Sequence, residues 1–184
     1  MANDMGPEDQ EPDFPEDSPF GGEGFPEGDD EGLRPPKGFP EGEDASTEQH
    51  EVKVMGVYEQ QEQHGRSTAF VLLRDGMGRS VLILIGRFEA FAISVALEGK
   101  TADRPMTHDL MNNIVNRLGG KVERILIDDL FQETYYAKVD IAVDSKVVQI
   151  DSRPSDAIAL GIRAKAPIFM AESVLRQAAV REES

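Results

Sequence analysis

Four side chains that can bind ions or move protons lie within residues 151–156: Asp151, Arg153, Ser155 and Asp156. Two carboxylates can hold a divalent cation or orient a water molecule, and a guanidinium can grip a phosphate or a carboxylate at two points. Pro154 suits the first position of a helix and disfavours helical backbone at the residue before it. The segment therefore predicts a helix with Arg153 as N-cap and Asp156 in the first turn, where a carboxylate meets free N–H groups.

Further groups suited to acid–base chemistry lie near the ends of predicted elements. His108 can act as a general base or as the acid for a leaving oxygen. The other candidate carboxylates are Glu89, Asp109, Asp128 and Asp129.

A structural interpretation of the same residues stays open beside the chemical one. Asp109 and Asp156 suit helix N-termini electrostatically, and His108 is then an exposed neighbour of a helix cap. Arg153 is then a bridge to Asp151 that locks the corner between strand and helix.

The elements that position these residues follow from hydrophobic periodicity and turn signals. A strand is expected around residues 52–58, a hairpin at 69–73 and 81–85, and a second hairpin at 122–130 and 135–143. Two further strands are expected at 147–150 and 167–170, and helices at 87–97, from Thr107 as cap to 118, from 154, and at 173–180. This order predicts an α+β fold with a mixed, largely antiparallel sheet, hairpins and three to four helices.

An internal repeat is suggested by an offset of 67 residues. Val81 and Ile83 correspond to Val148 and Ile150, and residues 89–93 correspond to residues 156–160. A duplicated βββα unit would place Glu89 and Asp156 in equivalent positions.

Residues 1–49 differ in composition from residues 50–184. They contain 16 of the 35 acidic residues and two basic ones, a net charge of −14, whereas the rest of the chain has a net charge of −2. A segment so charged and so rich in proline and glycine cannot bury enough apolar surface to offset its ordering entropy. We therefore predict a disordered acidic tail at 1–49, followed by one domain at 50–184.

Three Phe-Pro-Glu triplets begin at Phe14, Phe25 and Phe39. They are either short motifs that dock into a protein partner or compositional drift in a solubilising tail.

The chain contains no cysteine, which excludes disulfides and thiolate metal sites. The first 30 residues show no secretory signal pattern, and the longest apolar run, at 81–85, is too short to span a bilayer. A soluble cytoplasmic protein without a membrane partner is the expectation.

Four motifs occur together in this order: Ile85-Gly86 with Glu89, residues 104–110 (RPMTHDL), residues 150–157 (IDSRPSDA) and residues 166–169 (APIF). In this combination the sequence resembles the bifunctional nuclease domain family over about residues 52–180. Members of that family are described as acting on both DNA and RNA.

The resemblance implies phosphodiester hydrolysis of DNA and RNA. The catalytic candidates are His108, Asp109, Asp156 and Glu89, the substrate-binding candidates are Arg153 and Ser155, and the candidate ligands of a divalent Mg or Mn ion are Asp151 and Asp156. The near-neutral domain predicts weak, non-specific contact with nucleic acid, because such binding rests on basic residues. Homo-oligomerisation is a further expectation, and a non-catalytic interaction or regulatory module with the same fold is the alternative.

Overall fold

The computed structural model describes residues 48–61, 67–100 and 102–181. The Phe-Pro-Glu triplets and all but the last two residues of the predicted tail lie outside the described residues.

The described residues form strands and helices close to those expected from the sequence. In chain order they are β1 (Gln49–Gln61), β2 (Ser67–Asp75), β3 (Arg79–Ile85), α1 (Arg87–Leu97), α2 (Thr107–Arg117), β4 (Gly120–Phe131), β5 (Thr134–Val143), β6 (Lys146–Ser152), α3 (Pro154–Ala164), β7 (Ile168–Ala171), α4 (Glu172–Ala178) and β8 (Val180–Arg181).

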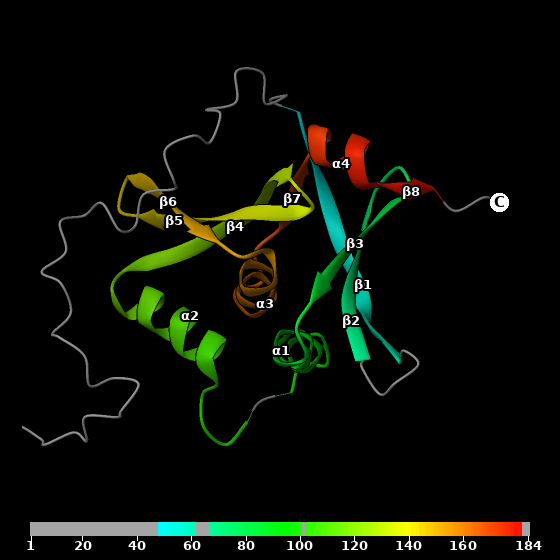
Figure 1. The fold of residues 1–184 in the computed structure, drawn as a ribbon. Coiled ribbons are helices and arrows are strands. Elements are labelled where there is room, and N and C mark those ends of the chain that lie inside the picture. The colour runs from blue at the N-terminus through cyan, green and yellow to red at the C-terminus, as the bar shows by residue number, and fades with distance from the viewer. Residues whose placement is uncertain (1–47, 62–66, 101, 182–184) are drawn as a thin grey trace, which may run out of the picture. The chain divides into compact units, whose positions relative to one another are not determined.

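The strands make one sheet in the order β6-β5-β4-β7-β1-β2-β3-β8. All neighbours are antiparallel except β4 and β7, which run parallel. Helix α3 contacts β4 and β5, α1 contacts β1 and β2, and α1, α2 and α3 lie together, whereas α4 lies near β3 (Figure 1). The predicted α+β class and mixed sheet are confirmed.

The repeat is visible in the element boundaries. The first and last residues of β6 each lie 67 positions after those of β3. The first and last residues of α3 likewise lie 67 positions after those of α1. Each half is a three-stranded meander followed by a helix, and the two meanders meet at the inserted β7. Glu89 and Asp156 both occupy the third position of their helices, so the duplication places them as expected.

One hydrophobic core joins the two halves. Its centre is the apolar run of α3 at 157–161, which is buried against β4 and β5. Residues of α1 and α4 such as Ile93 and Leu175 belong to the same core. Burying each large aliphatic side chain contributes about 1.5–3 kcal/mol. The α3 helix is therefore a fixed support for the residues at its N-terminus.

Several element boundaries differ from the expectation, among them the starts of α2 and α4, and one strand was not expected. The N-cap of α2 is Met106, whose backbone N–H donates to the Asp109 carboxylate at 3.0 Å, so Thr107 is the first helical residue and not the cap. Helix α4 begins at Glu172, one residue earlier than predicted. The two-residue strand β8 pairs with the start of β3 and was not predicted, because two residues show no periodicity.

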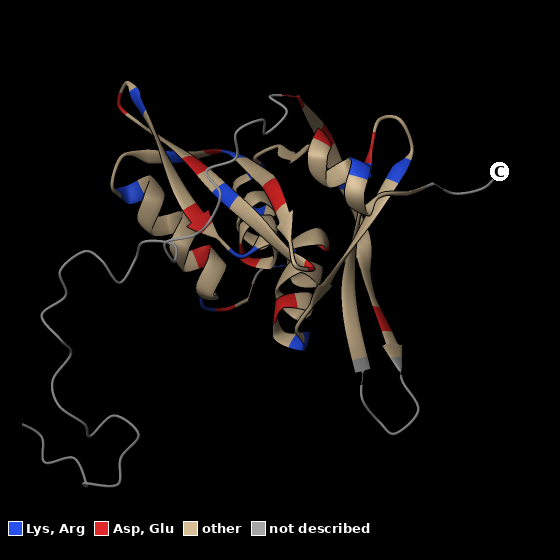
Figure 2. Ribbon diagram, turned by 45° about the horizontal axis from the view of Figure 1, so that its top comes forward, with Lys and Arg blue, Asp and Glu red and all other residues tan. Residues whose placement is uncertain are grey.

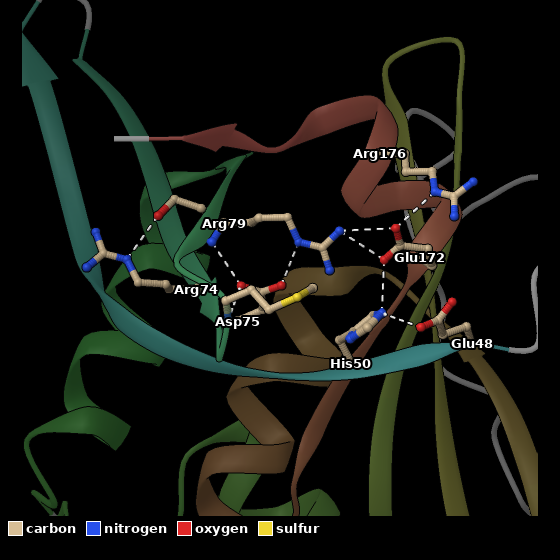
Figure 3. A network of polar contacts seen from close by, with 9 residues as sticks. Glu48, His50, Arg74, Asp75, Arg79, Glu172 and Arg176 are labelled. Atoms are coloured by element: carbon tan, nitrogen blue, oxygen red, sulfur yellow. Dashed lines mark hydrogen bonds and ion pairs between the residues drawn. The ribbon is translucent and has the colours of Figure 1, made fainter. Parts of the chain in front are cut away.

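A buried ionic cluster fastens α4 to β1 and to the β2–β3 turn (Figure 3). Arg79 donates from Nε to Asp75 at 2.7 Å and from Nη1 to Glu172 at 2.9 Å, and His50 Nε2 lies 2.9 Å from the same Glu172 oxygen. Arg176, on the exposed side, donates to Glu172 as well. The sequence provides no local signal for this cluster, since Arg79 and Glu172 are far apart in the chain.

Candidate functional site

The first turns of three helices meet at one place. Glu89 comes from α1, His108 from α2 and Asp156 from α3, and the N-cap residue Arg153 lies among them. The sequence forms this corner locally as expected: Arg153 has extended backbone (φ −68°, ψ 142°) and Pro154 begins the helix. The first helical turns thus direct two carboxylates toward a single guanidinium, and one imidazole toward one of these carboxylates.

Arg153 bridges the two equivalent carboxylates of the repeat. Its Nε donates to Asp156 Oδ2 at 2.7 Å, and its Nη1 lies 3.1 Å from Glu89 Oε1. The bridge to Asp151 that the structural interpretation proposed is wrong, because the partners of Arg153 are Asp156 and Glu89. Asp151 lies exposed on β6, in register with Lys138 of β5.

Asp156 has a second partner on its other oxygen. His108 Nε2 lies 3.2 Å from Asp156 Oδ1, and His108 is buried, with 8% of its surface exposed. Burial by itself would raise the pKa of Asp156. The hydrogen bonds from Arg153 and from His108 lower the pKa by more than burial raises it, so the pKa lies below its ordinary value. Asp156 is therefore held as a carboxylate.

The contact also acts on the arginine. The hydrogen bond and the charge of Asp156, followed by the charge of Glu89, raise the pKa of Arg153 above its already high ordinary value. The guanidinium side chain nevertheless remains 67% exposed. Arg153 is therefore a permanent cation, held by two carboxylates and open to solvent on its remaining side.

Glu89 is placed by a glycine at the N-cap of α1. A Cβ atom added to Gly86 would lie 2.2 Å from Glu89 Oε2, so the carboxylate lies in the space that a side chain at 86 would fill. In the repeat, position 86 corresponds to Arg153. One half thus supplies the cation, and the other half supplies room for the carboxylate that binds it.

A groove of about 670 Å³ opens beside this cluster. It is bounded by residues 82–85 of β3 on one side and by the end of the β4–β5 hairpin on the other, and Glu89, Arg153 and Ser155 reach it. Among the described residues that line the groove, neither His108 nor Asp156 occurs. A bound molecule would accordingly meet Arg153 and Glu89 first, whereas Ser155 is buried and the His108–Asp156 pair does not line the groove.

The remaining candidates are engaged elsewhere. Asp109 accepts a hydrogen bond at 2.7 Å from Arg163, whose buried guanidinium also donates to backbone carbonyls of α1 and α3. This contact ties the three helices together. Asp128 pairs with Lys138 at 2.7 Å, and Asp129 accepts the N–H of its neighbour Leu130.

Arginines cluster in the sequence around the β2–β3 hairpin, at Arg66, Arg74, Arg79 and Arg87, but Arg74 and Arg79 are engaged by other side chains. Arg79 is buried and ion-paired, Arg74 donates to Ser80 Oγ, and Arg66 lies outside the described residues. Basic and acidic residues are interspersed along the described elements (Figure 2). Arg153 is therefore the cation that the groove itself offers to an anion.

The described residues do not fit a preformed metal site. No group of three or more His, Asp or Glu side chains in this part of the chain is arranged to hold a metal ion. Arg153 instead occupies both carboxylates of the cluster. The divalent ion expected at Asp151 and Asp156 stays a prediction.

None of the helices in the described part of the chain has the length and apolar character needed to cross a bilayer.

Comparison with known proteins identifies relatives over most of the domain. An uncharacterized protein of Mycobacterium tuberculosis (strain ATCC 25618 / H37Rv) is 37% identical over 129 residues, which cover 70% of this chain and 75% of the relative. Bifunctional nuclease 2 of Arabidopsis thaliana is 28% identical over 105 residues, 55% of this chain and 32% of the plant protein. Bifunctional nuclease of Oryza minuta is 24% identical over 99 residues, 52% of this chain and 30% of that relative.

The plant relatives therefore share one region of about a third of their length with this chain. A family model, the bifunctional nuclease domain, matches residues 71–183, which include β3, α1, α2, α3 and the whole cluster around Arg153. The chain belongs to the bifunctional nuclease domain family.

Proposed function

We propose that this domain hydrolyses phosphodiester bonds of DNA and RNA at the groove beside Arg153. The observation that carries the proposal is the Glu89–Arg153–Asp156 bridge at the edge of that groove, in a chain of this family. A cation and a carboxylate that both reach one groove can bind a phosphate and activate a water molecule next to it.

Arg153 is the phosphate contact in this proposal. Its guanidinium is planar, permanently charged and 67% exposed, so it can engage two oxygens of a phosphate and stabilise the negative charge that develops there. A phosphate at the groove competes with Glu89 for Nη1. Asp156, braced by His108, keeps hold of Nε and so keeps the guanidinium in place.

Glu89 is the general base in this proposal. When phosphate takes over its partner atom, the carboxylate is released beside the bound phosphorus and can accept a proton from the attacking water. That water oxygen forms the new bond to phosphorus, the ester oxygen leaves with the bonding electron pair, and solvent supplies its proton. His108 and Asp156 act here as positioning residues, and Asp109 serves helix packing through Arg163.

The test is a nuclease assay on the purified full-length chain with labelled DNA and RNA, in EDTA and with Mg²⁺ or Mn²⁺. Glu89→Gln should lower the cleavage rate by about 10²-fold or more, as expected for loss of a general base. Asp156→Asn should also reduce it, because Arg153 loses its anchor. Glu98→Gln, the same change at the exposed C-terminal end of α1, should leave the rate unchanged.

The reactions in EDTA and with added metal decide whether a divalent ion is needed, independently of the role of Glu89. Cleavage that requires Mg²⁺ or Mn²⁺ would support the predicted ion, and cleavage in EDTA would refute that prediction. Full activity of Glu89→Gln would disprove the assigned base.

A second candidate function is a non-catalytic module that binds an anionic ligand. The observation that favours it is that Arg153 neutralises both carboxylates of the cluster. Oligonucleotide binding without cleavage under all metal conditions would select this alternative.

A further inference from the structure

The groove beside Arg153 has an apolar wall that the hydrolytic chemistry does not need. On β3, Leu84 is 71% exposed and Leu82 is 45% exposed, although both belong to a strand whose other face is buried. Leu130 and Tyr135 face them from the β4–β5 hairpin, and both are half-buried. Exposed leucines in a lined groove mark a surface suited to an apolar or aromatic group of a bound molecule.

Tyr135 contributes a flat ring to this wall. Its hydroxyl donates to the backbone carbonyl of Leu82 at 3.4 Å, so the side chain extends from the hairpin to β3. Burial raises the pKa of Tyr135, which keeps the phenol protonated and able to donate at neutral pH. A planar ring beside exposed aliphatic side chains is the kind of surface on which a nucleobase stacks.

The charges that line the groove restrict the form of nucleic acid that fits it. Arg153 is the one cation among the described lining residues, and Glu89 and Glu133 are acidic. Duplex DNA presents a charge about every 1.7 Å along its axis, and proteins bind it through series of lysine and arginine contacts. An unpaired nucleotide, by contrast, can also stack its base on a side-chain surface, a contact that a paired base cannot make.

We infer that the groove binds an unpaired nucleotide of single-stranded nucleic acid, with its base against Leu84 and Tyr135 and its phosphate on Arg153. In a duplex the same base is paired and stacked, so its face cannot reach the wall. The inference rests on the proposed function and specifies its substrate as single-stranded DNA or RNA.

The test measures binding by fluorescence anisotropy in EDTA, with the full-length protein. The probe is a short fluorescein-labelled oligothymidine, either alone or annealed to oligodeoxyadenosine to give duplex DNA. The single strand should bind at least about ten-fold more tightly than the duplex. Leu84→Ser should weaken binding of the single strand about five-fold or more, since a stacked base contributes about 1–3 kcal/mol. Tyr135→Phe keeps the ring and should retain binding, whereas Tyr135→Ser should weaken it.

Met77→Ser is the matched control, because Met77 is similarly exposed (65%) but lies in the β2–β3 turn and outside the groove. Equal or tighter binding of the duplex, or unchanged binding by Leu84→Ser, would overturn the inference. In the nuclease assay, equal cleavage of single-stranded and duplex substrates would also overturn the inference and leave the nuclease proposal intact. Single-strand binding without any cleavage would support the groove and refute the nuclease.

Discussion

At the scale of single residues, the site depends on one arginine with two competing roles. Arg153 neutralises Glu89 and Asp156 in the free protein, and the same guanidinium is the group best placed to meet an anion in the groove. Because the side chain is 67% exposed, its ion pairs contribute at most about 1 kcal/mol to folding. In the proposed function, its fork geometry is therefore expected to matter more for binding than for stability.

Arg153→Lys tests this separation of roles. Lysine keeps the charge but lacks the planar fork that holds Asp156 through Nε and Glu89 through Nη1, so activity should fall about ten-fold or more. The thermal midpoint should change little. Arg176→Lys is the control, because Arg176 is similarly exposed (73%) and also binds a glutamate, but it does not line the groove. A similar loss of activity in both variants, or full activity in Arg153→Lys, would contradict the assignment.

At the scale of elements, α3 shows that tertiary packing overrides helix propensity. Gly161 lies in the middle of this helix, where alanine is intrinsically favoured by about 1 kcal/mol. A Cβ atom at 161 would lie 2.6 Å from Ile125 Cγ1 of β4. The glycine therefore permits the close approach of α3 to the sheet.

Gly161→Ala should accordingly destabilise the domain, by about 1–3 kcal/mol, because the added methyl group overpacks a closed core. Urea unfolding followed by circular dichroism measures the change. A variant of equal or higher stability would show that Ile125 can move aside at little cost.

A second prediction at this scale concerns the ionic cluster that holds α4. Burial by itself would raise the pKa of Asp75, but hydrogen bonds from the Arg79 side chain and from backbone N–H groups lower it below the ordinary value of 3.8. A carboxylate with a lowered folded pKa contributes stability that is present above its unfolded pKa and is lost as pH falls through the folded pKa. The contribution of Asp75 should therefore be constant near neutral pH and be lost progressively as the pH falls below the ordinary pKa of 3.8.

Urea midpoints of the wild type and of Asp75→Asn between about pH 7 and about pH 3 measure this effect. The wild type should be the more stable protein at neutral pH, and the difference should shrink only in the acidic part of the range. A difference that stays constant with pH would assign the effect of the variant to packing and not to ionisation.

At the scale of the whole molecule, charge is divided unevenly along the chain. Residues 1–49 carry a net charge of −14, and the remainder carries −2. A polyanionic segment attached to a nucleic-acid-binding domain lowers the local concentration of other polyanions or competes for a basic group. The acidic segment is therefore predicted to weaken binding of nucleic acid.

Deletion of residues 1–47 tests this prediction and retains Glu48, whose carbonyl accepts the N–H of Glu172. The thermal midpoint should stay within a few degrees of the full-length value, since the predicted tail adds no core. Binding and cleavage of oligonucleotides should increase, most clearly at low salt, where screening is weak. Equal activity of both forms at every salt concentration would refute the effect on binding. A large fall in the thermal midpoint would refute the prediction that the domain's stability does not depend on the tail.

Local rules made much of the fold predictable from the sequence. Pro154 sets the start of α3 and the extended backbone of Arg153 through sterics that act between adjacent residues. Alternating and helical periodicity predicted both hairpins and α1, and the 67-residue offset predicted that Glu89 and Asp156 would occupy equivalent positions. These features need no knowledge of distant neighbours.

The partners of the charged residues were decided by tertiary structure. The structural interpretation paired Arg153 with Asp151, two residues away. Its partners are Asp156 and the distant Glu89, because the packing of α1 against α3 brings their N-termini together. Arg79 is buried against the distant Glu172 for a similar reason. The groove likewise exists because the β4–β5 hairpin lies opposite β3. Contacts between residues far apart in the chain depend on the order of the strands in the sheet. Sequence rules that act over a few residues cannot predict that order.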